Sequence, residues 1–447
     1  MSVTRSTLLV FLATLLVTTP ALAGDWPQWL GAERNGVSAE TGLLAEWPEA
    51  GPDVLWRAKL GKGFSGIAVV GDRLYTMYAE TGSEYAVCLN AADGEVVWRV
   101  KTGDYYQEKQ GGDGPRSTPT VDGEVVHVLS AEGTLYSLTA DTGGKIWQKS
   151  LVEEFGSAVP RWGFSTSPLV EGDLLFVEVG GLKGNILVNM VIKRQAGSTV
   201  AAIDKKTGRT LWTSLDDKMS YSSPIAYMVG GARQVAFFTA YALVGLSPQD
   251  GNLLWRFPWK TRYDVSAATP IFMPPDRIFI SSGGDGAVVR VKEDGVEQVW
   301  KNSEMKNHFG TSVYLDGYLY GFDESILKCI NAQTGEEKWK ARGYAKGTLI
   351  AADGHLIVLG EQGNLGLVEA TPEGFVETAG FQVMNARCWT APSLADGTVY
   401  NGDGRSQRRA GSLDVRRLVN ALDGTSHGGH DPFIAAAAPA RLPQTLL

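Results

Sequence analysis

The residue types best suited to bind a ligand gather in short segments that each lead into a strand-like run. Six such segments are 111–119, 159–168, 218–224, 261–270, 305–312 and 384–392. They carry the candidates Arg116, Arg161, Trp162, Tyr221, Arg262, Asp264, Asn307, His308, Arg387 and Trp389. Guanidinium groups bind carboxylates and phosphates, while tyrosine and tryptophan combine an apolar face with a polar edge. The set therefore predicts a site for a small anionic or sugar-like ligand, or for a peptide of a protein partner.

The same side chains have a second interpretation, in which they pack and hydrogen-bond neighbouring loops. The sequence leaves both interpretations open, and it offers little for catalysis. It contains no Ser-His-Asp order, no H-E-x-x-H and no P-loop signature. His127 and His355 fall within strand-like runs, where we expect satisfied core or edge residues. We therefore expect no catalytic residue and no metal ion at this site.

A short phrase that recurs along the chain indicates how these segments are positioned. It is "NAADGEVVW" at 90–98, and it returns as "TADTGGKIW" at 139–147, "DKKTGRTLW" at 204–212 and "NAQTGEEKW" at 331–339. The tryptophans at the last position of the phrase or its equivalents are Trp56, Trp98, Trp147, Trp212, Trp255, Trp300 and Trp339. One further step of 42 residues leads from Trp339 to Phe381. A period near 42 residues, with two longer steps, is typical of a four-stranded propeller blade.

Turn signals inside each period support four strands. In 117–147, Asp122-Gly123, Glu132-Gly133 and Thr142-Gly143 separate short runs rich in Val, Leu, Ile and Tyr. First strands are predicted to begin near 63, 116, 163, 220, 266, 308, 346 and 388. A lone strand at 53–60 precedes them, and 411–418 supplies a third strand for the last repeat. We predict an all-β, eight-bladed propeller of antiparallel blades closed by the N-terminal strand, with seven blades as the alternative.

The repeated pattern A-x-D/N-x-x-T-G-x-x-x-W resembles the propeller repeat of the pyrroloquinoline quinone enzymes. "DKKTGRTLW" and "NAQTGEEKW" match it best, and the resemblance covers roughly residues 53 to 400. The head at 26–49 resembles the start of exported propeller proteins of environmental bacteria. The repeat and blade number are also similar to those of the propeller subunit of the outer-membrane β-barrel assembly machine. The resemblance thus implies either a binding scaffold or a dehydrogenase.

In the quinone dehydrogenases, the resemblance implies a quinone beneath a disulfide of two adjacent cysteines, with Ca²⁺ beside it held by acidic and amide oxygens. The three cysteines here, Cys88, Cys329 and Cys388, are far apart in sequence, and we expect small buried side chains. Our main hypothesis is therefore a non-catalytic binding or protein-interaction scaffold without a cofactor. The alternatives are a dehydrogenase that uses pyrroloquinoline quinone with Ca²⁺, and a propeller that binds or processes carbohydrate.

Composition and charge narrow the class of protein. The chain has 447 residues, 44% of them hydrophobic, and its net charge of −8 argues against nucleic-acid binding. Residues 1–23 read as a cleaved signal peptide, with Arg5, an apolar stretch at 8–17 and "ALA" at 21–23. No cysteine follows that stretch, so we expect no lipid anchor there. The protein is expected to be periplasmic or secreted, to have no transmembrane segment in its mature chain, and to be a monomer.

The predicted organisation has four parts: a signal peptide at 1–23, a lead-in segment at 24–52, a propeller at 53–420 and a disordered tail at 421–447. The residues at 180–199 form an insertion, which is either an extended hairpin that reaches a partner or a neutral surface addition. His427, His430 and Asp431 in the tail have ligand types that bind metals, but tail composition favours a disordered segment. The pattern weakens after residue 400, and a reading-frame fault near Asn401 is an alternative explanation.

Overall fold

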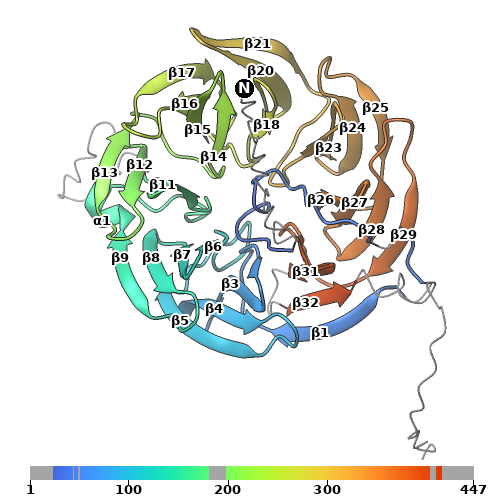
Figure 1. The fold of residues 1–447 in the computed structure, drawn as a ribbon, viewed down its shortest axis with the longest axis horizontal. Coiled ribbons are helices and arrows are strands. Elements are labelled where there is room, and N and C mark those ends of the chain that lie inside the picture. The colour runs from blue at the N-terminus through green and yellow to red at the C-terminus, as the bar shows by residue number, and fades with distance from the viewer. Residues whose placement is uncertain (1–23, 44, 49–50, 181–197, 403–408, 415–447) are drawn as a thin grey trace, which may run out of the picture.

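The computed structural model describes residues 24–43, 45–48, 51–180, 198–402 and 409–414. The predicted signal peptide, most of the 180–199 insertion, and the tail with His427, His430 and Asp431 lie outside these residues. The described strands form eight four-stranded antiparallel sheets that stand around a common centre (Figure 1). The architecture is that of a β-propeller, and the all-β prediction is confirmed.

Seven of the sheets each use four consecutive strands, because turn residues fold every repeat back on itself. These strands are β2 (Ala68–Val70), β3 (Arg73–Glu80), β4 (Ser83–Asn90), β5 (Val96–Asp104); β6 (Thr120–Asp122), β7 (Val125–Leu129), β8 (Thr134–Thr139), β9 (Lys145–Ser150); β10 (Leu169–Glu171), β11 (Leu174–Glu178), β12 (Val200–Asp204), β13 (Thr210–Ser214); β14 (Ile225–Val229), β15 (Ala232–Phe238), β16 (Ala242–Leu246), β17 (Leu253–Pro258); β18 (Ile271–Met273), β19 (Arg277–Ser282), β20 (Asp285–Lys292), β21 (Gly295–Asn302); β22 (Val313–Leu315), β23 (Tyr318–Asp323), β24 (Ile326–Asn331), β25 (Glu337–Ala341); β26 (Thr348–Ala352), β27 (His355–Leu359), β28 (Asn364–Glu369) and β29 (Glu377–Gln382).

The remaining sheet combines the two ends of the chain. It contains β30 (Ser393–Ala395), β31 (Thr398–Gly402), β32 (Arg409–Asp414) and, at its outer edge, β1 (Asp53–Lys59). β1 pairs with β32 in antiparallel register, with Asp53 opposite Asp414 and Lys59 opposite Arg409. The N-terminal strand therefore does join C-terminal strands, and β32 starts two residues before the predicted third strand at 411–418.

In six of the eight sheets the recurring tryptophan forms a hydrogen bond to the next sheet. Trp98 is 8% exposed, and its indole N–H donates to the carbonyl oxygen of Ala140 at 2.7 Å, in the last turn of the following sheet. The glycine of that turn, Gly143, has a φ of +68°, and a Cβ there would lie 2.8 Å from the Trp98 ring. Equivalent indole bonds run from Trp56 to Ala91, Trp147 to Lys205, Trp212 to Pro248, Trp300 to Ala332 and Trp339 to Thr371. Trp98 and its equivalents in these repeats therefore pack and hydrogen-bond between neighbouring blades.

Two repeats depart from this arrangement. Trp255 donates instead to the side-chain oxygen of Gln234 at 2.7 Å, within its own sheet. In the sheet of β26 to β29, Ala379 stands opposite Leu367, next to the bulge, where the other repeats have tryptophan. The predicted step to Phe381 was therefore two residues too long.

The apolar side chains between neighbouring sheets form the core. Cys88 and Cys329 occupy equivalent places, opposite Trp98 and Trp339, and all three cysteines are buried, as predicted. His127 is also buried, against Trp147, but neither ring nitrogen has a hydrogen-bond partner. The prediction of a satisfied histidine was wrong at this position, and burial lowers the pKa of His127 to about 4. His355 bonds the carbonyl oxygen of Asp353 through Nδ1.

The one helix among the described elements is α1 (Leu151–Phe155), which leads from β9 towards the next sheet. Ser150 caps its start by accepting from the backbone N–H of Glu153, and Leu151 and Phe155 are buried. Within the described ranges, no helix is long and apolar enough to cross a membrane.

Candidate functional site

The first strands of neighbouring sheets contact one another and so surround the centre of the ring. They begin between two and six residues later than predicted, at Ala68, Thr120, Leu169, Ile225, Ile271, Val313, Thr348 and Ser393. The residues before them form loops because proline often stands directly before the strand and cannot donate to a sheet. These loops are the six segments predicted to carry the site, together with the corresponding residues of the first and seventh repeats. They form what we call the mouth.

Serine and threonine side chains join the mouth loops of successive sheets. Ser167 accepts from the backbone N–H of Thr118 at 2.9 Å, and Ser223 accepts from that of Ser167 at 2.9 Å. The series continues to the last sheet, where the Thr390 hydroxyl donates to the carbonyl oxygen of Phe64 at 3.1 Å. Short hydroxyl side chains thus hold the mouth loops at fixed spacing.

The lead-in segment fills the centre beyond the mouth, where Figure 1 shows it in dark blue. Its Arg34 is 3% exposed and donates to the carbonyl oxygens of Ser167, Pro168 and Pro224. Burial lowers the pKa of Arg34 to about 9. Further bonds join Trp26 to Val69, Pro27 to Val121, Trp29 to Thr269 and Ser38 to Ala351. The segment 24–43 is therefore a plug that links the first strands of several sheets.

One side of the mouth is lined by aromatic rings from three sheets. Phe64 stacks on Trp389 with ring centroids 5.5 Å apart, and Phe309 lies 4.9 Å from Trp389 at a tilt. His308 is exposed and contacts Phe309 edge to face at 5.3 Å. Partial burial of the imidazole and the charge of nearby Lys346 lower the pKa of His308. The loops of three sheets thus meet in one aromatic row.

Arg116 connects this row with the next loops. Its guanidinium lies 5.6 Å from the centre of the Phe64 ring and 6.0 Å from that of Tyr106. It donates to the carbonyl oxygens of Gly112 at 2.6 Å and Gly114 at 2.9 Å. No carboxylate of the described residues lies within ion-pair distance of it. Partial burial lowers the pKa of Arg116.

The other predicted aromatics lie beyond Arg116. Trp162 meets Tyr221 edge to face at 5.4 Å, and the Arg161 guanidinium lies 5.1 Å from the centre of the Trp162 ring. Arg161 is exposed, whereas burial raises the pKa of Tyr221 to about 12. A Cβ at Gly111 would lie 3.2 Å from the Arg116 guanidinium, 3.3 Å from the Glu108 carboxylate and 3.7 Å from Trp162. The structure therefore brings Arg116, Trp162 and Tyr221 into one neighbourhood.

Two charged side chains contact Trp389. Its indole N–H donates to the Glu361 carboxylate at 3.0 Å, and the Arg387 guanidinium lies 4.4 Å from its ring centre. Arg387 itself stands 3.8 Å from Glu361. These contacts give Trp389 and Arg387 structural roles as well as a place at the mouth.

Three predicted residues are not part of this neighbourhood. Asn307 is 4% exposed; its amide donates to the Phe322 carbonyl at 3.0 Å and accepts from Ser312 at 3.0 Å, so its polar atoms serve the fold. Asp264 forms an ion pair with Lys218 at 3.0 Å. Arg262 is exposed and lies against Tyr263, 5.2 Å from its ring centre.

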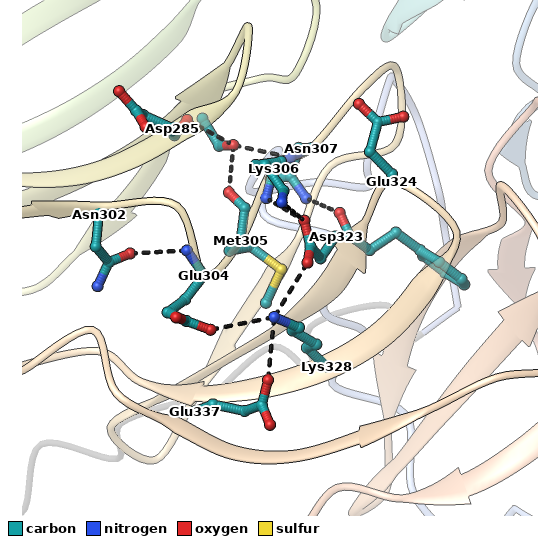
Figure 2. Close-up of polar contacts among 12 residues, drawn as sticks. Asp285, Asn302, Glu304, Met305, Lys306, Asn307, Asp323, Glu324, Lys328 and Glu337 are labelled. Atoms are coloured by element: carbon teal, nitrogen blue, oxygen red, sulfur yellow. Dashed lines mark hydrogen bonds and ion pairs between the residues drawn. The ribbon is translucent and has the colours of Figure 1, made fainter.

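Asn307 lies beside a cluster of charges that the sequence did not indicate (Figure 2). Lys328, 5% exposed on β24, contacts the carboxylates of Glu304 at 3.2 Å, Asp323 at 3.0 Å and Glu337 at 3.0 Å. Burial opposes the charge of Lys328, but these bonds outweigh it and raise its pKa. The cluster joins three strands of one sheet and is fully paired, so it stabilises the fold.

Phe64, Phe309, Tyr106 and Arg34 were missed by sequence reasoning. The positions of Phe64 and Phe309 carried a usable signal, because each stands four residues before the start of a first strand, as Arg116 and Trp389 do. Arg34 carried no such signal, since the lead-in lies outside the repeat. For metals, the described residues contain no group of three His, Cys, Asp or Glu side chains that could hold an ion.

Sequence comparisons agree with the repeat architecture. Residues 44–181 and 105–341 match the family model described as "Outer membrane protein assembly factor BamB". The protein of that name from Shewanella oneidensis is 25% identical over 340 residues, which cover 72% of this chain and 78% of the relative. The one from Yersinia pestis is 26% identical over 305 residues, covering 65% and 68%.

Solved structures show the same fold at low identity. BamB from Moraxella catarrhalis aligns with a TM-score of 0.57 and 13% identity, over 81% of this chain and 100% of that one. The quinohemoprotein alcohol dehydrogenase ADHIIG from Pseudomonas putida HK5 aligns with a TM-score of 0.61 and 11% identity, over 94% and 84%. Since the family matches together span more than half of the sequence, this chain belongs to the family of quinone-like-repeat propellers described as outer membrane protein assembly factor BamB.

Proposed function

We propose that this chain is an exported, non-catalytic propeller that acts as a scaffold for protein partners in outer-membrane assembly. The observation that carries the proposal is its membership of a family described as an outer membrane protein assembly factor. We further propose that the eight sheets form a ring closed through β1, which is supported by the pairing of β1 with β32 and by the Trp56 bond to Ala91 of the following sheet. A closed ring leaves only short strand edges and is a rigid surface for binding.

The residues of the mouth do not fit a quinone cofactor. The three cysteines are separate buried thiols, so no pair of adjacent cysteines can cover a quinone. The Asn307 amide is committed to two bonds within the fold. Phe64, Trp389 and Phe309 pack against one another across the mouth. We therefore propose that no quinone binds, and we keep the dehydrogenase as the alternative that the experiment must address.

The proposal is tested by site-specific photo-crosslinking in exporting cells. A photo-crosslinking residue replaces Tyr263, which is 67% exposed beside the mouth, and in a second variant it replaces Leu253 on the outer strand β17, which is 49% exposed. Mass spectrometry then identifies the partners. Crosslinks to outer-membrane assembly proteins from either position support the scaffold.

Crosslinks to none of these proteins from either position would contradict the scaffold. A parallel arm adds pyrroloquinoline quinone and Ca²⁺ to the purified protein and follows dye reduction with alcohols and sugars. Turnover in that arm would establish the dehydrogenase instead.

A further inference from the structure

The mouth combines aromatic rings with two arginines, Arg116 and Arg161, that form no ion pair with the described residues. Along its loops, Lys62, Lys218 and Lys346 are each paired with a carboxylate, at 2.8, 3.0 and 3.0 Å. Arg116 and Arg161 make no ion pair with any residue that the structure describes, although the protein as a whole carries a net charge of −8. Glu108 and Asp113 lie near Arg116 and offset part of its charge, but neither is within ion-pair distance of it. The mouth of this acidic protein therefore keeps two arginines without a directly paired carboxylate among the described residues.

Because Arg116 is partly withdrawn from water, its lack of a paired carboxylate raises the free energy of the unbound protein. Its guanidinium is partly buried between Phe64 and Tyr106, and among the described residues two carbonyl oxygens accept from it. A charge that is withdrawn from water without a counter-charge raises the free energy of the folded state. An anion that enters the mouth relieves that cost, and a carboxylate can accept two parallel N–H bonds from a guanidinium.

A second buried guanidinium lies deeper along the same centre. Arg34 of the plug is held by carbonyl oxygens, the Thr120 hydroxyl and the Gln28 amide, with no carboxylate among its partners. Two cations along the centre of the ring attract anions towards the mouth, because a concave, low-dielectric surface focuses the field of its charges.

The aromatic residues select among anions. Trp162, Phe64, Phe309 and Tyr221 are partly exposed at the mouth. Tryptophan, tyrosine and arginine together are the residue types that dominate the energy of protein interfaces. A free inorganic anion would use the arginines and leave these rings uncovered. An acidic polypeptide segment that also carries apolar side chains uses both.

We propose that the mouth binds an acidic, aromatic-containing segment of a partner protein, whose carboxylates contact Arg116 and Arg161 and whose apolar side chains lie on Trp162 and Phe64. This inference rests on the proposed scaffold role and specifies the chemistry of the partner. It assigns the arginines of the mouth as the residues that determine specificity.

The test uses the full mature chain and a short fluorescein-labelled peptide of glutamate, aspartate and phenylalanine, followed by fluorescence anisotropy. The matched peptide replaces each acid with its amide. Arg161→Glu reverses an exposed charge without removing a hydrogen bond of its side chain, and we expect it to weaken binding about tenfold or more. Arg209→Glu makes the same change on the exposed turn between β12 and β13, outside the mouth loops, and we expect no effect.

Arg116→Gln and Trp162→Ala extend the test to the buried part of the mouth, with circular dichroism as the control for folding. Affinity for the acidic peptide should fall with added salt, and it should be lower for Arg116→Gln and for Trp162→Ala than for the unchanged chain. Equal affinity for the amide peptide, stronger binding of polygalacturonate than of the peptide, or equal loss with Arg209→Glu would overturn the inference. If the peptide does not bind while outer-membrane assembly proteins still crosslink from Leu253, the acidic segment is wrong and the scaffold stands.

Discussion

Replacement of Trp98 tests whether the repeated phrase joins neighbouring sheets. In the folded protein its ring lies against Gly143 of the next sheet and 6.0 Å from the Tyr75 ring of its own sheet. Its N–H donates to Ala140, whose carbonyl oxygen otherwise has only the Tyr75 hydroxyl at 3.5 Å. Trp98→Ala therefore removes both the packing and the bond that connect two sheets.

The magnitude follows from the burial and the hydrogen bond. Truncation of a buried tryptophan to alanine lowers the free energy of unfolding by about 3–5 kcal/mol, because the cavity cannot fully collapse. Trp98→Phe keeps most of the apolar contact but deprives the Ala140 carbonyl oxygen of its N–H donor, and its expected cost is about 1–2 kcal/mol. Val97→Ala is the matched control: Val97 is the preceding residue and is 41% exposed, so we expect a change within about 0.5 kcal/mol.

Equilibrium urea unfolding, followed by tryptophan fluorescence and by circular dichroism, measures all three variants. Coincident transitions from the two probes are required before free energies are compared. If Trp98→Ala costs no more than Val97→Ala, the indole does not join the sheets and the reasoning is refuted. If Trp98→Phe costs as much as Trp98→Ala, the hydrogen bond rather than the packing holds the joint.

Three further predictions concern buried charges. Arg34→Met removes the bonds that tie the plug to the carbonyl oxygens of two sheets, and urea unfolding should show a loss of about 2–4 kcal/mol. Lys328→Met leaves three carboxylates without their shared cation and should cost about 3–5 kcal/mol, whereas Lys340→Met, at an exposed ion pair, should cost under about 0.5 kcal/mol in the same assay. Burial raises the pKa of Glu178 from 4.5 to about 8, so the folded state keeps a proton that the unfolded chain loses. The contribution of Glu178 to the free energy of unfolding is complete below pH 4.5 and is lost as the pH rises to about 8. Glu178→Gln should therefore flatten the dependence of this free energy on pH in that range, measured by urea unfolding at several pH values.

The strands and turns were predictable because their signals are local. Gly94, in the repeated phrase at 90–98, has a φ of +77°, a conformation that favours glycine. A Cβ there would lie 2.5 Å from the Trp56 ring of the preceding sheet. The glycine is thus required twice, by the turn and by the neighbouring tryptophan. The starts of the first strands were predicted too early, because the mouth loops have the same apolar and small residues as the strands that follow them.

The composition of the mouth was only partly predictable. Arg116, Trp162, Tyr221 and Trp389 were found because they stand in loops that the repeat places at equivalent positions. Whether such a side chain faces the mouth or the fold depends on which backbone groups the folded chain leaves within its reach, and the repeat pattern does not specify them. Asn307 shows this, since its amide turns to the Phe322 carbonyl of its own sheet.

The buried acids of the propeller sharpen the electrostatic argument for the mouth. Glu84 and Glu178 are fully buried, and burial raises the pKa of each to about 8, so each is mostly protonated at neutral pH. Neither therefore compensates the charges of Arg34 and Arg116 at the centre of the ring. Apart from Glu40, Asp217 and Asp323, the other acidic residues of the described chain are exposed or half-buried. An acidic partner segment is repelled by this acidic surface and attracted by the mouth, so charge alone directs it to the one place where the aromatic rings can bind it.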